Sequence, residues 1–369
     1  MSLLAAVSSA DLPEGAQGAF EEARARLGPL DQAALAAAWS RQASLTKPPG
    51  SLGRLEDLAA QLSGIAGTCP PPRPLPAVVG VFAGDHGVVA EGVTPWPSEV
   101  TAQMVGNFLH GGAAVNVLAR RVGAEVLVVD VGVAGALPAG AGLVRAKVRP
   151  GTANLAEGPA MTVEEATAAL DVGAALASRL AEAGAACLLT GDMGIGNTTP
   201  SACLVAALTG LPAERVTGRG TGVDDERLAR KQAVVAEAVR RLPADASALE
   251  VLASVGGLEI AALAGYVVGA AAARRPVLLD GVIAVAAALV AVALAPACRD
   301  YLVAGHRSVE PGAGAGLEHL GLTPLIDLDL RLGEGSGACL ALPVLDAAAS
   351  LLAEMATFEG AGVAQGPLA

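Results

Sequence analysis

A stretch of apolar residues that breaks into glycines near the middle of the chain constrains its fold more than any other feature. Residues 185–190 are apolar up to Thr190, and the chain continues as Gly191-Asp192-Met193-Gly194-Ile195-Gly196-Asn197-Thr198-Thr199. From Ser201 to Leu208 the composition is rich in Ala and Leu, as in a helix. This order predicts a buried strand, a loop and the N-terminus of a helix.

The loop of this predicted unit is suited to a phosphate group. A helix N-terminus offers free backbone N–H groups and the positive end of the helix dipole, and Gly194 and Gly196 leave room for a ligand. Thr199 stands where the dinucleotide fingerprint requires a third Gly or Ala, and no Gly-Lys-Ser/Thr ending is present. Asn197 and Thr198 add donors that suit a single phosphate. The alternative is an ordinary strand-to-helix turn that uses glycine.

Further apolar runs alternate with helical segments along the chain. The spacing of Thr162 and Glu165 is that of a capping box, which begins a helix. Residues 282–297 are apolar but too short for a spanning helix of ~20 residues, so they indicate a buried helix. This alternation predicts an α/β fold, a mostly parallel sheet with helices on both faces and ligands at the carboxyl ends of its strands. The expected strands are 77–83, 124–131, 185–190, 275–279, 301–304 and 325–328.

The two ends of the chain predict a smaller helical part. Helical segments are expected at about 16–27, 30–41 and 54–65, and a long Ala/Leu helix is expected to end near Met355. We therefore divide the chain into three parts. They are a helical segment at residues 1–69, an α/β domain at residues 70–336, and a C-terminal helix at residues 337–369 that closes on the small helical domain.

Charge and cysteine content exclude several classes of function. The 369 residues carry a formal net charge of −12 without a cluster of Lys and Arg, which argues against nucleic-acid binding. The five cysteines are scattered, odd in number and free of Cys-x-x-Cys spacing, which fits a reducing compartment. Residues 1–14 lack the basic and apolar regions of a signal peptide. We expect a cytoplasmic protein that does not bind a membrane.

Two other glycine-rich loops are candidates for binding. Gly84-Asp85-His86-Gly87 follows the predicted strand 77–83. The chain has four histidines and none at metal-ligand spacing, so no metal is expected, and Asp85 and His86 are expected to shape the loop through hydrogen bonds. The segment 216–226 contains three glycines beside Arg219 and Thr221 and precedes a helix that carries Lys231. It is either a second ligand loop or a long solvated turn.

Glu334 is a candidate for acid–base chemistry. It is a lone carboxylate between Gly333 and Gly335, directly before the last predicted helix. The alternative is an acid that only stabilises the N-terminus of that helix through the dipole. Apolar surroundings would raise the pKa of Glu334 and the helix N-terminus would lower it, so the sequence leaves the direction open.

Seven motifs resemble, in the same order, those of nicotinate-nucleotide:dimethylbenzimidazole phosphoribosyltransferases. Together they cover the chain from about Thr46 to its end. One departure is Asp192, since some members of that family carry Glu there. The motifs are residues 46–53, 83–87, 108–113, 191–199, 218–222, 306–312 and 331–337.

The resemblance implies a reaction, a fold and a set of site residues. The reaction would transfer the 5-phosphoribosyl group from nicotinate mononucleotide to 5,6-dimethylbenzimidazole and give α-ribazole 5′-phosphate and nicotinate. The fold would be a Rossmann-like parallel α/β domain with a smaller helical domain, assembled as a homodimer. Glu334 would be the catalytic base. The substrate-binding residues would be Asp85, His86, Thr94, Gln103, Asp192, Gly194, Gly196, Asn197, Thr198, Gly220, Thr221, Lys231 and His306.

The chemistry of this reaction agrees with the residues present. Nicotinate leaves from a positively charged pyridinium and needs little proton donation, whereas the incoming benzimidazole must lose an N–H proton, so one base is sufficient. A loop at Gly194 and Gly196, with Lys231 as a point charge, would anchor the phosphate, and no cofactor is required. Two other functions stay open at this point: a nucleotide-binding protein without turnover, and an enzyme similar to nucleoside phosphorylases. The acceptor base also stays open, because apolar pockets discriminate methyl groups by only ~1–3 kcal/mol.

Overall fold

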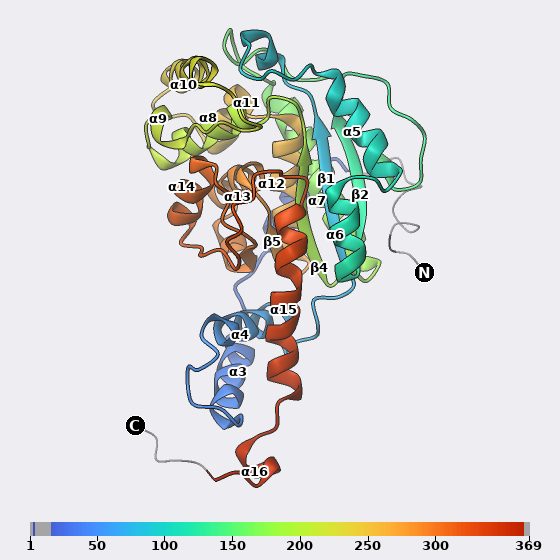
Figure 1. Ribbon diagram of the computed structural model, residues 1–369, viewed down its shortest axis with the longest axis vertical. Helices are drawn as coiled ribbons and strands as arrows, with labels where there is room; N and C mark the ends of the chain where they lie inside the picture. Colours follow the sequence, from blue (N-terminus) through green and yellow to red (C-terminus); the bar gives the residue numbers. More distant parts are fainter. Residues whose placement is uncertain (1–2, 4–15, 365–369) are drawn as a thin grey trace.

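The computed structural model describes residue 3 and residues 16–364, and the expectation about a signal peptide at residues 1–14 falls almost entirely outside them. At its centre is a six-stranded sheet in the order β3-β2-β1-β4-β5-β6 (Figure 1). Every pair of neighbouring strands is parallel, which confirms the predicted α/β fold. The strands are β1 Ala77–Gly84, β2 Ala124–Gly132, β3 Leu143–Arg145, β4 Cys187–Met193, β5 Val277–Leu279 and β6 Leu302–Ala304.

The strand order reverses between β1 and β4. The chain adds β2 and β3 on one side of β1 and then adds β4, β5 and β6 on the other side. This is the strand order of the Rossmann fold. In open parallel sheets the crevice outside the carboxyl ends of the strands at such a reversal is where ligands bind. The topology therefore predicts a ligand site at the loops that follow β1 and β4.

Helices cover both faces of the sheet, because its strands are apolar on both sides. Along β1, Val78 and Phe82 belong to one hydrophobic cluster, and Val79 and Val81 belong to a second cluster on the opposite face. The first cluster is covered mainly by α7 Val163–Glu182, α8 Thr198–Thr209, α11 Ala248–Val255, α12 Leu258–Ala272 and α13 Val282–Leu294. The second is covered mainly by α5 Glu99–Leu109, α6 Ala114–Val122 and α15 Ser336–Glu354.

Small residues let the covering helices approach closely in a core that has few aromatics. A Cβ atom at Gly173 of α7 would lie 1.8 Å from the carbonyl oxygen of Ala262, and one at Gly265 of α12 would lie 1.9 Å from that of Leu170. Both distances are far below van der Waals contact, so α7 and α12 pack backbone against backbone at these glycines. The predicted buried helix at 282–297 is confirmed as α13, in which residues 282–291 are all buried.

The helices α3 Gln32–Ser44 and α4 Arg54–Ala66 pack on each other and on α15, below the sheet in Figure 1. By contrast, α2 Ala19–Arg26 packs on α7 and α12. By length and composition α15 could cross a membrane, but 56% of its most apolar 18-residue stretch is buried inside the fold. The domain boundaries at 69/70 and 336/337 stay predictions. The other elements are η2 Gly87–Glu91, α9 Ala213–Val216, α10 Asp225–Arg240, η3 Pro296–Tyr301, α14 Pro311–Leu320 and α16 Phe358–Ala361.

Two local expectations need correction. The strand expected at 325–328 is wrong, since only Ile326 forms a bridge, to His306, and Leu328 is 58% exposed. Pro324 precedes this segment and Asp329 has a left-handed φ of 54°, so the backbone cannot extend a ladder there. The helix expected from Ser201 begins earlier, at Thr198, with Asn197 as its N-cap residue. Asn197 and Thr198 therefore lie at the start of α8 itself, and Gly194 and Gly196 lie in the turn before it.

Candidate active site

The loops after β1 and β4 meet at the reversal of the strand order. A Cβ atom at Gly194 would lie 2.3 Å from the carbonyl oxygen of Gly84 and 3.1 Å from Nε2 of His86. Only glycine fits at position 194, because the two loops touch backbone to backbone. Gly196 has a φ of +89°, a conformation that L-residues with side chains rarely adopt. These two glycines let the chain turn from β4 into α8 directly beside the tip of β1.

A small cavity of about 50 Å³ lies at the N-terminus of α8. That volume holds a compact polar group rather than a whole nucleotide. The positive end of the helix dipole favours an anion there, although the Thr199 N–H already bonds the Gly196 carbonyl oxygen and Pro200 has no N–H. Eight of the residues predicted to bind substrate line this cavity, namely Thr94, Gly194, Gly196, Asn197, Thr198, Gly220, Thr221 and Lys231.

Lys231 brings a positive charge to the wall of this cavity. The side chain comes from α10, is 1% exposed, and donates hydrogen bonds from Nζ to Oγ1 of Thr198 at 2.7 Å and to the carbonyl oxygen of Gly218 at 3.1 Å. Burial lowers the pKa of Lys231 to about 8, although the charge of Glu310 opposes the change. Glu310 itself accepts the Gly220 N–H at 2.7 Å and thereby fixes the second glycine loop. Among the described residues no carboxylate forms an ion pair or hydrogen bond with this buried ammonium group, so it is suited to an incoming anion.

Asp192 connects the phosphate loop to the rest of the site. Its Oδ2 accepts a hydrogen bond from Nδ2 of Asn197 at 2.9 Å, while its Oδ1 is buried and has no hydrogen-bond partner among the described residues. Burial raises the pKa of Asp192 well above its usual value, and the carboxylate of Asp280 adds to the rise while Asn197 opposes it. A Cβ atom at Gly333 would lie 3.2 Å from Oδ1 of Asp192, so the loop before α15 comes against this side chain.

Glu334 lies in that loop in an unusual backbone conformation. Gly333, Glu334 and Gly335 have φ values of 79°, 65° and 93°, so three consecutive residues are left-handed. A left-handed non-glycine residue costs free energy and persists only where the surroundings hold it, which is typical of functional sites. The Glu334 carbonyl oxygen would lie 2.6 Å from a Cβ at Gly191, which places the loop directly on β4.

The surroundings of the Glu334 side chain settle the direction of its pKa shift. The side chain is 7% exposed and its Oε2 has no hydrogen-bond partner among the described residues. Burial raises the pKa of Glu334 to about 7, the charge of Asp280 adds to the rise, and the Val115 backbone amide opposes it. Such a carboxyl changes between its two protonation states near neutral pH, as a general base requires.

Asp85 and His86 shape the loop after β1. Oδ2 of Asp85 accepts the Ala134 N–H at 2.8 Å, and Nε2 of His86 lies 2.8 Å from Oε1 of Glu259 at the start of α12. Burial alone would lower the pKa of His86, but the carboxylates of Glu259 and Asp85 outweigh it and the pKa is raised. These side chains therefore form hydrogen bonds, as expected, but with residues outside their own loop, and their contact with substrate stays a prediction.

The remaining predicted residues lie in different surroundings. His306 follows β6, is buried, and has Nε2 3.5 Å from Oδ1 of Asp280. Gln103 is exposed on α5 and does not line the small cavity. Thr94 does line it. The structure therefore gathers the phosphate-type residues in one cavity and brings Asp192 and Glu334 beside it.

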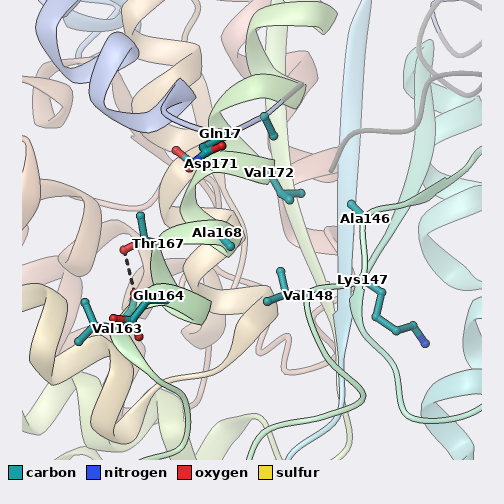
Figure 2. Close-up of a pocket in the computed structure, with 11 residues that line it drawn as sticks. Gln17, Ala146, Lys147, Val148, Val163, Glu164, Thr167, Ala168, Asp171 and Val172 are labelled. Carbon is teal, nitrogen blue, oxygen red and sulfur yellow. Dashed lines mark hydrogen bonds between the residues drawn. The ribbon is translucent and has the colours of Figure 1, made fainter. Parts of the chain in front are cut away.

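A larger cavity of about 670 Å³ lies elsewhere, along α7 (Figure 2). It is lined by residues from the start of the described chain, from the segment 146–148 and from α7, and by none of the predicted site residues. Lys147 extends away from its other lining side chains in Figure 2 and bonds the Val133 carbonyl instead. This cavity offers no matched set of donors for a nucleotide.

Comparison with known proteins gives the chain a family. A phosphoribosyltransferase family model matches residues 27–363. A nicotinate-nucleotide–dimethylbenzimidazole phosphoribosyltransferase of Salinispora tropica is 59% identical over 364 residues, which span 94% of this chain and 99% of the relative. One of Chloroflexus aurantiacus is 55% identical over 341 residues, which span 92% and 97%. The chain belongs to the nicotinate-nucleotide–dimethylbenzimidazole phosphoribosyltransferase family.

Solved structures of this phosphoribosyltransferase family share the fold. The crystal structure of nicotinate-nucleotide–dimethylbenzimidazole phosphoribosyltransferase from Thermus thermophilus aligns with a TM-score of 0.87 at 53% identity, and covers 91% of this chain and 100% of that one. A second, titled CobT from the same organism, aligns with a TM-score of 0.88 at 54% identity, and covers 90% and 100%. The resemblance found in the seven motifs is thus confirmed over nearly the whole chain.

Sequence reasoning missed three buried carboxylates that support the phosphoribosyltransferase site. Glu259 holds His86, Glu310 holds Gly220, and Asp280 holds the start of α15. Each lies far from its partner in the sequence, so the pairing itself left no local signal. The position of Asp280 after the predicted strand 275–279 and that of Glu310 within the motif 306–312 were the only hints. Within the described residues, no group of three His, Cys, Asp or Glu side chains is arranged to bind a metal ion.

Proposed function

We propose that this protein transfers the 5-phosphoribosyl group from nicotinate mononucleotide to 5,6-dimethylbenzimidazole, giving α-ribazole 5′-phosphate and nicotinate. The names of relatives that match almost the whole chain support this reaction. The observation that carries the mechanism is the buried carboxyl of Glu334, with a pKa of about 7, on a loop that touches the strand leading into the phosphate-type loop.

The 5′-phosphate of nicotinate mononucleotide would bind in the small cavity at the start of α8. Backbone N–H groups near Gly194 and Gly196 and the ammonium group of Lys231 supply donors and positive charge for it. Fixing the phosphate sets the position of the ribose, so that its anomeric carbon lies between the leaving and the attacking ring. Asp192, which bonds Asn197, lies between this cavity and Glu334 and is suited to contact the ribose hydroxyl groups.

Glu334 would accept the proton that the benzimidazole loses. The lone pair of one benzimidazole nitrogen forms a bond to the anomeric carbon, while the bond from that carbon to the pyridinium nitrogen breaks and its electron pair stays on nicotinate. The proton of the other benzimidazole nitrogen passes to the Glu334 carboxylate. Since the pKa of Glu334 lies near neutrality, the carboxylate is a stronger base than an ordinary glutamate and is still ionised in part at pH 7.

The purified protein tests this function directly. Incubation with nicotinate mononucleotide and dimethylbenzimidazole should release nicotinate and an equal amount of the phosphorylated riboside, measured by chromatography. Binding of the mononucleotide without product would support a nucleotide-binding protein instead. Product that forms only when inorganic phosphate is added would support an activity similar to nucleoside phosphorylases. Adenine offered in competition with dimethylbenzimidazole identifies the preferred base.

A cytoplasmic homodimer is the state we propose for the enzyme. Four of the five free cysteines are buried and none is paired, as in proteins of a reducing compartment. Val309, Leu328 and Leu332 are exposed apolar side chains on two segments that a backbone hydrogen bond from Val309 to Leu330 joins. Such a patch fits an interface between protomers. Sedimentation equilibrium measures the mass, and a monomer at micromolar concentration would contradict the proposed assembly.

A further inference from the structure

Asp280 is a buried carboxylate at the carboxyl end of β5, and the hydrogen bonds of its side chain are all with the start of α15 and the residue before it. It is 2% exposed. Its Oδ2 accepts the N–H of Gly335 at 2.9 Å, and its Oδ1 accepts the N–H groups of Gly337 at 2.7 Å and Ala338 at 3.1 Å. One side chain thus binds three of the N–H groups that a helix N-terminus leaves without partners inside the helix. It does so from a different strand, 55 to 58 residues earlier in the chain.

These hydrogen bonds hold the residues that directly follow Glu334. The left-handed run ends at Gly335, and Gly335 is the first residue that Asp280 binds. His306 supports the same turn, since a Cβ atom at Gly337 would lie 2.0 Å from Cδ2 of its ring. Asp280, at the end of a sheet strand, therefore holds the residues on the C-terminal side of Glu334 and helps to maintain its unfavourable backbone conformation.

The charge of Asp280 acts on Glu334 as well. The N-terminus of α15 alone would favour the ionised form of a neighbouring glutamate and lower its pKa. Asp280 occupies that N-terminus with its own negative charge and is the charged group that raises the pKa of Glu334. The other titratable groups around Glu334 are Asp192 near the end of β4, whose pKa responds to both Asp280 and Glu334, and His306 after β6. Two carboxylates thus share one site with the proposed base.

We propose that Asp280 is a positioning residue for the transfer reaction, which holds the Glu334 loop in its reactive conformation and keeps the Glu334 carboxyl basic. This inference rests on the proposed role of Glu334 as the base. It assigns no contact with substrate to Asp280, because all the hydrogen bonds that the Asp280 side chain makes are to backbone N–H groups of the loop and of α15.

Asp280→Asn is the variant that tests the proposal, with kcat/KM measured from pH 5 to pH 9. Asparagine keeps the size and one acceptor oxygen but removes the negative charge, and its amide group cannot accept from all three N–H groups. We expect kcat to fall about 10-fold to 100-fold, because the base is displaced. We also expect the fall in activity on the acid side to move to a lower pH by about one unit, because a like charge beside Glu334 is lost.

Asp280→Glu separates the effect of the negative charge on Glu334 from the effect of the hydrogen bonds that position the Glu334 loop. The longer side chain keeps a carboxylate at the N-terminus of α15 but cannot keep the same three distances. The expected result is a lower kcat with the acid-side pKa near the wild-type value. Asp130→Asn is the matched control, since Asp130 is a buried carboxylate at the end of β2 with a raised pKa, and it bonds Val133 and Lys147 rather than the Glu334 loop. It should leave the acid-side pKa unchanged.

Binding of nicotinate mononucleotide checks that each variant has folded, because the phosphate cavity does not involve Asp280. An acid-side pKa that stays at the wild-type value in Asp280→Asn, or that moves equally in Asp280→Glu and Asp280→Asn, would overturn the proposal. The Glu334→Gln variant keeps this outcome separate from a failure of the proposed base. If the acid-side fall in wild-type activity persists in Glu334→Gln, the role of Glu334 is wrong and the inference on Asp280 falls with it.

Discussion

The two halves of the candidate site have opposite electrostatic characters. The half at the start of α8 consists of glycine backbone, hydroxyl groups and the buried ammonium group of Lys231. The half before α15 collects the carboxyl groups of Asp192, Asp280 and Glu334, of which Asp192 and Glu334 have raised pKa values. The first suits a fixed anion and the second suits a mobile proton. The difference indicates that one part of the crevice binds the phosphate and another part accepts the proton.

Glu334→Gln is expected to cause the largest loss of activity, and to impair proton transfer without impairing phosphate binding. Glutamine keeps the size of the side chain but cannot take the proton, so turnover should fall by ~10²–10⁴. The dissociation constant for nicotinate mononucleotide, measured by calorimetry, should change little because its phosphate binds in the other half. Glu318→Gln, an exposed glutamate on α14, is the control and should be normal. Near-normal turnover of Glu334→Gln would shift the role of base to Asp85, His86 or Asp192.

Lys231→Met is expected to impair phosphate binding without impairing proton transfer. Methionine fills a similar volume, so the main loss is one charge-assisted contact with the phosphate, about 2 kcal/mol or ~30-fold in the dissociation constant of nicotinate mononucleotide. Affinity for dimethylbenzimidazole, which carries no phosphate, should stay within about twofold. Lys147→Met, in the cavity along α7, is the matched control. Equal losses for both ligands would mean that Lys231 supports the structure instead.

The smallest expected effect of Glu334→Gln is on the free energy of unfolding, and it tests whether the pKa of Glu334 is raised in the folded protein. Because its folded-state pKa of about 7 lies above the ordinary value of 4.5, folding favours the protonated form. Wild-type stability therefore falls as pH rises from 4.5 to 7, and the cost is fully present above pH 7. Glu334→Gln removes this cost, so it should be more stable than wild type at pH 8 by at least ~1 kcal/mol and nearly equal at pH 4.5. Denaturant unfolding at both pH values measures the difference; a variant less stable at pH 8 would contradict it.

The sequence predicted the binding half better than the proton-transfer half, for a physical reason. Gly194, Gly196, Asn197 and Thr198 are close together in the chain, so a strand, a loop and a helix start can be identified from local pattern. The bounds were less exact: the strand expected at 185–190 is β4 Cys187–Met193, and α8 begins at Thr198 instead of Ser201. The environment of Glu334 instead depends on Asp280, 54 positions earlier, and on burial against β4. Distant pairings of this kind have no local signature, which is why the direction of its pKa shift could not be predicted.

The same distinction explains the errors in the fold. Buried strands such as β1 and β4 are continuous apolar runs, and all of them were identified where they exceed five residues. The segment at 325–328 is apolar in part as well, but Leu328 faces solvent and only Ile326 pairs with a neighbour. Whether a short run is paired depends on the partners that the fold offers it, since β propensity depends on context. The short strand β3 Leu143–Arg145 was missed for the same reason.

The pH dependence of wild-type kcat/KM tests the division of the site most directly, because each half contains one group that titrates near neutrality. Glu334 must be ionised to accept a proton, so activity should fall as pH drops below about 7. Lys231 must be protonated to bind phosphate, so activity should fall as pH rises above about 8. We therefore expect a bell-shaped profile of kcat/KM against pH. The fall at acid pH should disappear in Glu334→Gln, and the fall at alkaline pH should disappear in Lys231→Met. A profile that is flat from pH 5 to pH 9, or whose two sides both persist in these variants, would contradict it.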